Sequence, residues 1–122
     1  MINARLDTVT QSLMFAFETL LENPHVRAEL VTDPSKIPAF VEETLRLNPV
    51  ALFPPRVVAQ DTQIDAVSVP AGTRVSACLG AANRDPSTHE NPDETVLGRE
   101  GRHWAFGGGV HRCLGRTSLG PR

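Results

Sequence analysis

The chain has little of what marks a secreted, membrane-spanning or nucleic-acid-binding protein. Its 122 residues include two cysteines, too few for the disulfide framework of a small secreted domain. No apolar run approaches the roughly 18 residues that cross a bilayer, and the first residues lack the long apolar segment of a secretory signal. The formal net charge of −2 excludes charge-driven binding to a polyanion. We therefore expect a cytoplasmic protein with neither nucleic acid nor membrane as a partner.

What is present is the composition of one globular unit. Hydrophobic residues make up 40% of the chain, and its 9 glycines bring the apolar share near that of ordinary globular proteins. A chain of this length predicts one domain. The sequence opens within a helical pattern and stops soon after another such pattern begins. We therefore expect residues 1–122 to form a single partial domain, truncated at both ends.

The first half of the chain predicts three helices. Over residues 6–22 apolar side chains recur at steps of three and four, which is typical of one helical face. An asparagine cap and a first-turn proline follow, and they predict a second helix over 24–31. A third has Pro38 in its first turn and should end before Asn48, because a residue that precedes proline avoids the helical region. The apolar face of the first helix consists of Leu6, Val9, Leu13, Phe17, Leu20 and Leu21.

The middle of the chain changes to short β-like segments at 56–60, 64–69 and 73–79. The last two are separated by a Pro-Ala-Gly turn signal, which predicts a small antiparallel sheet. Cys78 lies in the last segment and is expected to be a small core residue. From 81 to 109 the residue types predict an irregular path, and so long an irregular stretch is typical of a functional segment. The predicted fold class is mainly α with a small antiparallel β-sheet (α+β).

The most informative stretch runs from Phe106 to Gly115. Three adjacent glycines at 107–109 let the backbone turn tightly and let a flat ligand approach it closely. Cys113 stands where a helix could begin, and the backbone N–H groups there favour a thiolate, which can bind a metal. From these residues alone, a glycine-rich loop with a buried cysteine remains the alternative. A phosphate-binding loop is disfavoured, because no Gly-Lys-Ser/Thr follows.

A zinc site is a further alternative for the same region. The candidate ligands are Cys78, His103, His111 and Cys113. A structural zinc site commonly takes its four ligands in close pairs, and here only His111 and Cys113 are neighbours in the sequence. The spacing of the candidate ligands therefore disfavours zinc.

Glu43 and Arg46 lie three residues apart, on one face of the third predicted helix. An isolated pair of this kind is usually an exposed ion pair of small energetic weight. However, Glu43-Thr44-Leu45-Arg46 resembles the E-x-x-R motif of the cytochrome P-450 family. Residues 106–115 match that family's haem-binding signature, F-G-x-G-x-H-x-C-x-G, at every fixed position. The segments between the two motifs also resemble bacterial members, so the likeness covers nearly the whole chain.

The resemblance implies a partial cytochrome P-450 fold that binds haem b, the iron protoporphyrin IX. Cys113 would be the axial thiolate ligand of the iron, which favours cleavage of the O–O bond. His111 and Arg56 would hold the haem propionates, and Phe106 would shield the sulfur side of the haem. The other signature positions assigned to the cofactor are Gly107, Gly109 and Gly115.

The same resemblance gives a structural role to three charged residues. Glu43, Arg46 and Arg99 would form the internal charged triad of the family. This triad would tie the third helix to the irregular segment that leads to the cysteine.

Near the beginning of the chain, Asp7 and Thr8 resemble the acid–alcohol pair that relays protons to bound dioxygen in the family. A carboxylate beside a hydroxyl suits proton delivery, and a helix cap is the alternative interpretation. The chain departs from the family pattern in two places. Arg5 replaces a small residue beside the proposed relay, and Thr95 stands near the position of an expected aromatic residue.

The reaction implied by the resemblance is that of a monooxygenase, which inserts one atom of dioxygen into a small organic substrate and reduces the other to water. Electrons would come from a ferredoxin- or flavodoxin-type donor that docks near Arg112 and Arg116, and substrate would lie near Leu52 and Phe53. Members of the family are several times longer, so we expect the apolar face of the first helix to lack partners. The alternatives are a non-catalytic truncated remnant that binds haem weakly or not at all, and a stand-alone haem carrier or sensor.

Overall fold

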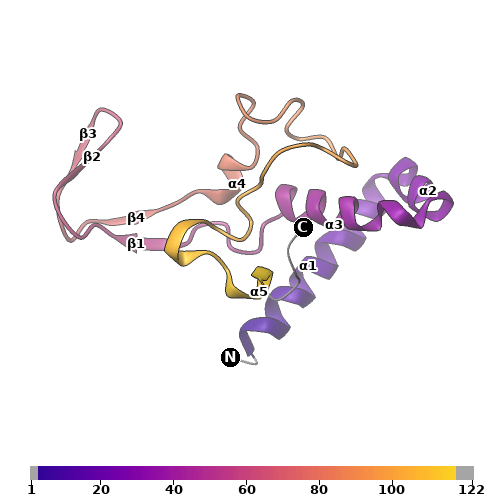
Figure 1. The fold of residues 1–122 in the computed structure, drawn as a ribbon, viewed down its shortest axis with the longest axis horizontal. Coiled ribbons are helices and arrows are strands. Elements are labelled where there is room, and N and C mark those ends of the chain that lie inside the picture. The colour runs from indigo at the N-terminus through magenta and orange to yellow at the C-terminus, as the bar shows by residue number, and fades with distance from the viewer. Residues whose placement is uncertain (1–2, 118–122) are drawn as a thin grey trace.

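The computed structural model describes residues 3–117, and the side chains of residues 6–116. Figure 1 shows an open arrangement, with helices at one end, a β-hairpin projecting at the other, and irregular chain between them. The helices are α1 (Asn3–Glu22), α2 (Pro24–Thr32), α3 (Ile37–Leu47), α4 (Leu79–Ala82) and α5 (Leu114–Thr117), with 3-10 turns η1 (Pro34–Lys36) and η2 (Gly109–His111). The strands are β1 (Pro55–Val57), β2 (Thr62–Ile64), β3 (Val67–Val69) and β4 (Arg74–Ser76). The predicted fold class, mainly α with small antiparallel pairing, is confirmed.

The three helices predicted for the first half are confirmed as α1, α2 and α3. Pro24 occupies the first turn of α2, where its missing N–H removes no helical bond. The expected side-chain cap is wrong, because the Asn23 amide turns back and donates to the Thr19 carbonyl at 2.9 Å. The last backbone bond of α3 runs from Asn48 N–H to the Thr44 carbonyl at 2.8 Å, and the next residue is a proline.

The strand bounds predicted from the sequence are wrong for residues 64–69. Asp65 adopts a left-handed φ of 51°, a conformation that aspartate tolerates in turns. The chain therefore folds back at this point, and β2 pairs with β3 in an antiparallel hairpin. β1 pairs with β4 in a separate antiparallel sheet. The Pro-Ala-Gly turn is present, with Gly72 at φ 81°, but it leads from one sheet to the other instead of joining paired strands.

Cys78 is also placed differently from the prediction. β4 ends at Ser76, and Cys78 precedes the first residue of the short helix α4 as an exposed free thiol. The backbone N–H of Leu79 bonds to the Leu52 carbonyl at 3.0 Å, so the chain leaves the strand direction at this point. Cys78 is therefore not a core residue of a strand.

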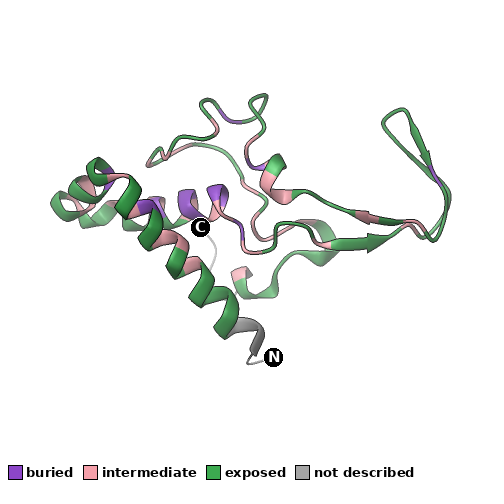
Figure 2. Cartoon of the chain, turned by 180° about the vertical axis from the view of Figure 1, so that it is seen from behind, coloured by how far each residue is buried: buried purple, intermediate pink, exposed green. Residues whose placement is uncertain are grey.

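The apolar core is small for a chain of 13.2 kDa. The buried apolar side chains are Val26, Phe40, Leu47 and Val69. The chain exposes 8988 Å², whereas a compact monomer of this mass exposes about 6,400 Å². Figure 2 shows the consequence: buried segments concentrate on α3 and the chain beside it, and most of the remainder is exposed.

The apolar face of α1 is not covered by the described part of the chain. We define the α1 stripe as Leu6, Val9, Leu13, Phe17 and Leu21, whose exposed fractions range from 53% to 74%. α1 instead contacts α3 and α2, and Thr19 is its buried residue, at 4% exposure. This confirms the expectation that the apolar face lacks partners, although Leu20 is half-buried. No helix in residues 3–117 is long and apolar enough to span a bilayer.

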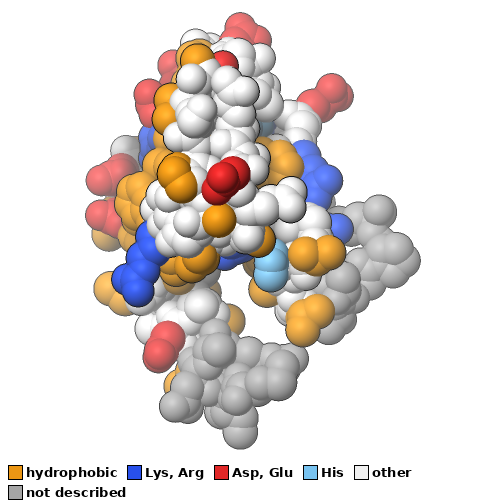
Figure 3. All heavy atoms as spheres, turned by 90° about the vertical axis from the view of Figure 1, so that its left-hand side faces the viewer, with side chains coloured by type: hydrophobic (Ala, Val, Ile, Leu, Met, Phe, Trp, Pro, Cys, Tyr) orange, Lys and Arg blue, Asp and Glu red, His pale blue; other side chains and the backbone are white. Residues whose placement is uncertain are grey.

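The opposite end of the molecule has a mixed surface. Figure 3, seen from the side of the β2–β3 hairpin, shows hydrophobic side chains interspersed with acidic and basic ones. Among the hairpin residues, Ile64 and Val67 are more than half exposed. A hairpin of two short strands is only marginally stable by itself, so the hairpin depends on its junction with the rest of the chain.

Candidate functional site

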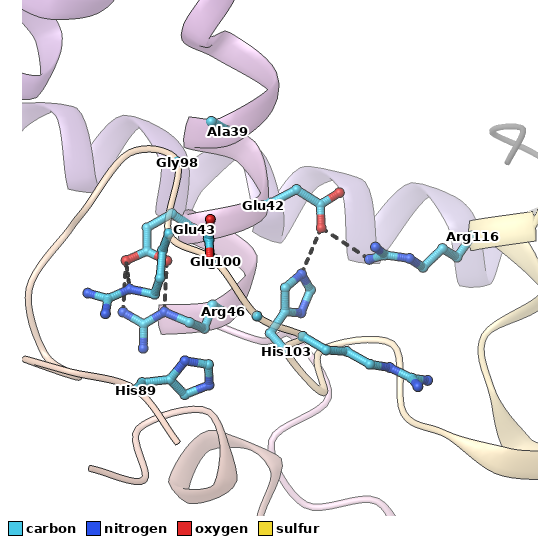
Figure 4. A pocket seen from close by; sticks show the side chains of 12 residues that line it. Ala39, Glu42, Glu43, Arg46, His89, Gly98, Glu100, His103 and Arg116 are labelled. Carbon is cyan, nitrogen blue, oxygen red and sulfur yellow. Dashed lines mark hydrogen bonds and ion pairs between the residues drawn. The ribbon is translucent and has the colours of Figure 1, made fainter. Parts of the chain in front are cut away.

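Three charged residues form a buried cluster between α3 and the irregular segment of residues 83–105. We call Glu43, Arg46 and Arg99 the charged cluster. The Arg46 Nε–H donates to Glu43 Oε2 at 2.8 Å, and the Arg99 Nε–H donates to Glu43 Oε1 at 3.0 Å. Glu43 and Arg46 are 4% and 2% exposed. The structure thus brings together the three residues that the sequence assigned to one triad, and Figure 4 shows the Glu43–Arg46 pair on α3.

Arg46 also holds the irregular segment by its backbone. One terminal nitrogen, Nη1, donates to the carbonyls of Asn83 and Pro92, and the other, Nη2, donates to the carbonyl of Glu94 and to Glu43. A buried guanidinium is costly unless its N–H groups are paired. The irregular segment therefore takes its path from these carbonyl contacts, which no hydrophobic periodicity can encode.

The hydrogen bonds of the charged cluster stabilise the ionised form of the Glu43 carboxylate. Burial raises the pKa of Glu43, but hydrogen bonds from Arg46, from the Val96 backbone N–H and from Arg99 outweigh burial, so that the pKa lies below its ordinary value. Arg99 continues the network to the carbonyls of Asn91 and Glu90. Glu43 is therefore ionised at neutral pH, and the cluster is held by complementary charges.

Asn83 connects the charged cluster to the chain that leads to the cysteine. It is 0% exposed, and its side-chain N–H donates to the Arg46 carbonyl at 3.0 Å. Its side-chain oxygen accepts from the Trp104 backbone N–H at 2.6 Å. One buried amide thus joins α3, the end of α4 and the start of the cysteine-containing loop.

The loop from Phe106 to Cys113, hereafter the cysteine loop, closes on itself. The Cys113 N–H donates to the Phe106 carbonyl at 2.9 Å. Gly107 and Gly109 have left-handed φ values of 63° and 60°, which favour glycine. At Gly108 a Cβ would lie 2.7 Å from the Trp104 ring, closer than real Cβ contacts. Gly107 and Gly109 are therefore favoured by backbone conformation, and Gly108 by close packing against Trp104.

Cys113 is presented to the outside by this loop. It is an exposed free thiol, and α5 begins at the next residue. Gly115 lies against the thiol, since a Cβ at that position would be 3.6 Å from the Cys113 Sγ. The alternative of a buried cysteine is wrong for Cys113.

The other residues assigned to the cofactor have accessible polar groups. His111 and Arg56 are exposed, and the Arg56 guanidinium donates to the neighbouring Pro55 carbonyl at 2.8 Å. Phe106 is half-buried, with its ring 6.0 Å from that of His103. These groups suit a ligand that offers carboxylates and a flat apolar face.

The zinc alternative finds no support in the part of the chain that the structure describes. Residues 3–117 contain no group of three or more His, Cys, Asp or Glu side chains that could hold a metal ion. His103, one of the candidate ligands, instead places its Nε2 2.8 Å from Glu42 Oε2.

Asp7 and Thr8 lie in the first half of α1, and both are exposed. The Thr8 carbonyl accepts from the Ser12 hydroxyl at 2.8 Å, one helical turn later. α1 begins at Asn3, so the pair lies inside the helix and the helix-cap alternative is wrong. The Arg5 side chain, which the sequence placed beside this pair, lies outside the described side chains.

The structure adds a residue that sequence reasoning missed, His89. It is 3% exposed, and neither ring nitrogen has a hydrogen-bond partner. Burial lowers the pKa of His89, and the positive charges of Arg46 and Arg99 lower it further, which keeps the ring neutral at physiological pH. His89 thus occupies the place of an apolar side chain beside the charged cluster. No sequence motif predicted this, because the charged groups around His89 come from separate segments of the chain, with Arg46 on α3 and Arg99 in the irregular segment.

The described residues thus contain an exposed cysteine thiol on a closed loop and a buried, internally paired Glu-Arg-Arg cluster. Comparison with known proteins assigns the chain to a family. The sequence profile described as Cytochrome P450 matches residues 1–117, and the chain belongs to the cytochrome P450 family.

Individual relatives agree with this assignment. The chain is similar to cytochrome P450 105C1 of a Streptomyces species, with 46% identity over 89% of this chain and 29% of the relative. It is also similar to cyclomarin C epoxidase CymV of Salinispora arenicola, with 39% identity over 88% of this chain and 28% of that protein. The chain thus spans less than a third of the length of these curated relatives.

Solved structures give the same result for the fold. The crystal structure of P450BioI in complex with an acyl carrier protein ligated to hexadec-9Z-enoic acid matches with a TM-score of 0.86 and 36% identity, over 90% of this chain and 29% of that one. The ligand-free structure of cytochrome P450 TbtJ1 matches with a TM-score of 0.85. The partial cytochrome P-450 fold expected from the sequence is therefore confirmed.

Proposed function

We propose that this chain supplies the cysteine-ligand side of a haem-thiolate monooxygenase and binds the iron of haem b through Cys113. The observation that carries the proposal is the closed cysteine loop, which holds an exposed thiol between the Cys113 N–H···O=C Phe106 bond and the start of α5. A thiolate is the ligand that favours O–O bond cleavage at a haem iron. Membership in the cytochrome P450 family supports the same assignment.

The donor groups of the chain fit haem. An exposed thiol fits the iron, and the exposed side chains of His111 and Arg56 can form charge-assisted bonds with two propionates. Gly107, Gly109 and Gly115 carry no side chain, so that a flat macrocycle can approach the backbone around Cys113 closely. Phe106, half-buried at the start of the loop, excludes water from the sulfur side.

The chemistry supplied by bound haem is activation of dioxygen for insertion of one atom into a small organic substrate, with the second atom leaving as water. That stoichiometry requires two protons and two electrons. Asp7 and Thr8, on α1, hold and move the protons through the carboxylate and the hydroxyl. Glu43, Arg46 and Arg99 do not touch the reacting atoms, and their role is to fix the segment that precedes the cysteine loop.

The electron donor is a ferredoxin- or flavodoxin-type protein that works with this chain in the cytoplasm. Arg112 is exposed beside Cys113 and offers a positive charge to an acidic donor surface. Arg116 contributes less than the sequence suggested, because its guanidinium is paired with Glu42 at 3.2 Å. The exposed Leu52 and Phe53 lie on the chain that precedes Arg56, where an apolar substrate is expected. The epoxidase relative is consistent with oxygen insertion into an organic molecule.

The test is an absorption spectrum of the purified chain after reconstitution with haem, reduction and exposure to carbon monoxide. A red-shifted Soret band, typical of a thiolate-ligated ferrous–CO complex, is expected for the wild type and for Cys78→Ala. Cys113→Ala should lose this band. Retention of the band in the Cys113 variant, or its loss in the Cys78 variant, would contradict the ligand assignment.

A further inference from the structure

Glu42 stands next to Glu43 on α3 but faces a different segment. Its Oε2 lies 2.8 Å from His103 Nε2 and 3.2 Å from Arg116 Nη1. Figure 4 shows the two neighbouring carboxylates directed at separate partners, with His103 and Arg116 converging on Glu42. α3 therefore binds Arg99 and the Val96 backbone through Glu43, and through Glu42 it binds the two residues that flank the cysteine loop, His103 and Arg116.

His103 approaches Glu42 in one tautomer. The backbone N–H of Ala105 donates to His103 Nδ1 at 3.2 Å, so Nδ1 is the acceptor and the ring proton of the neutral side chain lies on Nε2. That N–H then donates to the Glu42 carboxylate, a charge-assisted bond. The His103 side chain is 8% exposed and Glu42 is 33% exposed, so the bond is partly shielded from water.

The Glu42 carboxylate is held in its charged form. Burial raises the pKa of Glu42, but the hydrogen bond from His103 and the positive charge of Arg116 outweigh burial and leave the pKa below its ordinary value. At neutral pH this carboxylate therefore accepts from both partners, and each partner belongs to a different arm of the loop.

Both partners of Glu42 also contact Phe106. The Arg116 guanidinium carbon lies 4.9 Å from the centre of the Phe106 ring, within cation–π range, and the His103 ring centre lies 6.0 Å from it. The backbone then completes the connection. The Phe106 carbonyl accepts from the Cys113 N–H at 2.9 Å, and the Arg116 N–H donates to the Cys113 carbonyl at 3.3 Å.

We infer that Glu42 is a positioning residue for Cys113: one carboxylate on α3 fixes the entry of the cysteine loop through His103 and its exit through Arg116. We call the contacts of Glu42 with His103 and Arg116 the clamp. The positioning role of the clamp rests on the proposed haem function, whereas the contacts themselves are present in the haem-free chain. Removal of the carboxylate charge frees both arms of the loop and lets the Cys113 backbone and thiol leave their position. The charged cluster, one residue away on α3, keeps its own contacts.

The first experiment uses the haem-free chain and hydrogen exchange of single amides measured by NMR. In Glu42→Gln the amides of Cys113 and Arg116 should exchange at least about tenfold faster, the factor expected for loss of one hydrogen bond to a charged group. The amide of Val96, which donates to Glu43, should keep its rate. Glu18→Gln, an exposed position on α1, is the charge-matched control and should change neither.

A second variant keeps the test decisive if the α3 substitution affects folding. Arg116→Gln removes the ion pair from the loop side, at a side chain that is 31% exposed, and should accelerate Cys113 exchange in the same way. Unchanged Cys113 exchange in both variants would overturn the inference.

The third measurement separates the clamp from the proposed function. In the haem-reconstituted chain, Glu42→Gln should lower the fraction of ferrous–CO complex with the red-shifted Soret band, and Glu42→Asp should restore part of it. A wild-type chain without this band would contradict the proposed function, while the exchange rates would still decide on the clamp. A wild-type band that Glu42→Gln leaves unchanged in amount would overturn the positioning role.

Discussion

The charged cluster and the α1 stripe differ in how far their side chains are buried. In the charged cluster, Glu43 and Arg46 are almost completely buried, and the Arg46 guanidinium makes five hydrogen bonds. In the α1 stripe, apolar side chains such as Phe17 are more than half exposed. The comparison shows that the charged cluster finds its partners within residues 3–117, whereas the apolar side chains of the α1 stripe do not.

The two kinds of interaction need different amounts of partner surface. A hydrogen bond is satisfied by one correctly placed partner, and Arg46 finds its partners on one helix and one segment of irregular chain. Burial of an apolar helix face needs a second surface of similar area. The chain spans 29% of the length of its relative from Streptomyces, and the described residues provide no such surface for the α1 stripe.

The largest effect should follow from breaking the charged cluster. Arg46→Ala removes two of the hydrogen bonds that the Glu43 carboxylate accepts and the guanidinium donors of the Asn83 and Pro92 carbonyls. It should lower the free energy of unfolding by about 3–5 kcal/mol. Urea unfolding followed by circular dichroism measures this. The control is Asp93→Asn, which removes the exposed ion pair between Arg84 and Asp93 and should cost less than about 1 kcal/mol. Equal losses in the two variants would contradict the comparison.

A second loss of stability is expected at Asn83. In Asn83→Ala the Trp104 N–H and the Arg46 carbonyl each lose a buried partner, at about 1–3 kcal/mol for each unsatisfied group. The same urea titration gives the value. A loss below about 0.5 kcal/mol would mean that water or a shift of the backbone replaces the side chain.

His89 should give a gain of stability. His89→Phe removes two buried ring nitrogens without partners, and should raise the free energy of unfolding by about 1–3 kcal/mol. The pKa of His89 is lowered from its ordinary value of 6.5, so the unfolded chain takes up the proton first as the pH falls. The wild type should therefore lose stability as the pH falls below 6.5, and the variant should lose less.

The control for this prediction is His25→Phe, at an exposed position of α2. It should change the free energy of unfolding by less than about 0.5 kcal/mol. A destabilised His89→Phe chain would show that the imidazole is preferred in this position for its shape or through a hydrogen bond with water.

The smallest effect on stability is expected in the α1 stripe. Phe17→Ser changes a side chain that is 66% exposed and should alter the free energy of unfolding by less than about 0.5 kcal/mol. It should reduce self-association in sedimentation velocity, because exposed apolar patches drive association. The matched control is Phe40→Ser at the 4% exposed core position of α3, where a loss of about 3–5 kcal/mol is expected.

The sequence predicted the helices of the first half, in which apolar residues recur at a regular spacing. α1, α2 and α3 followed from apolar spacing and from proline positions, because helix ends are decided by neighbouring residues. The hairpin between β2 and β3 did not follow, because its turn at Asp65 lacks the Asn-Gly or Asp-Gly signal. Cys78 was wrongly assigned to a strand for a related reason: nothing local marks the end of β4.

The candidate site could be predicted only where a motif exists. Cys113 and its glycines followed from a resemblance, and the structure explains two of those glycines by their left-handed φ values. Asn83 depends on partners that are 21 and 37 positions away in the sequence, and His89 lies among charged groups from α3 and from the irregular segment. The spacing of residues along the chain carries no information on such contacts, so the buried amide and the buried imidazole required the three-dimensional structure.

The packing of Trp104 against Gly108 has a spectroscopic consequence. Trp104 is the one tryptophan of the chain, which contains no tyrosine. The intrinsic fluorescence of this residue, which is 40% exposed, therefore reports on the surroundings of the cysteine loop. Far-ultraviolet circular dichroism instead reports mainly on α1, α2 and α3. One sample therefore carries a separate optical probe for each region, and transitions that do not coincide would show that the loop opens before the helices unfold.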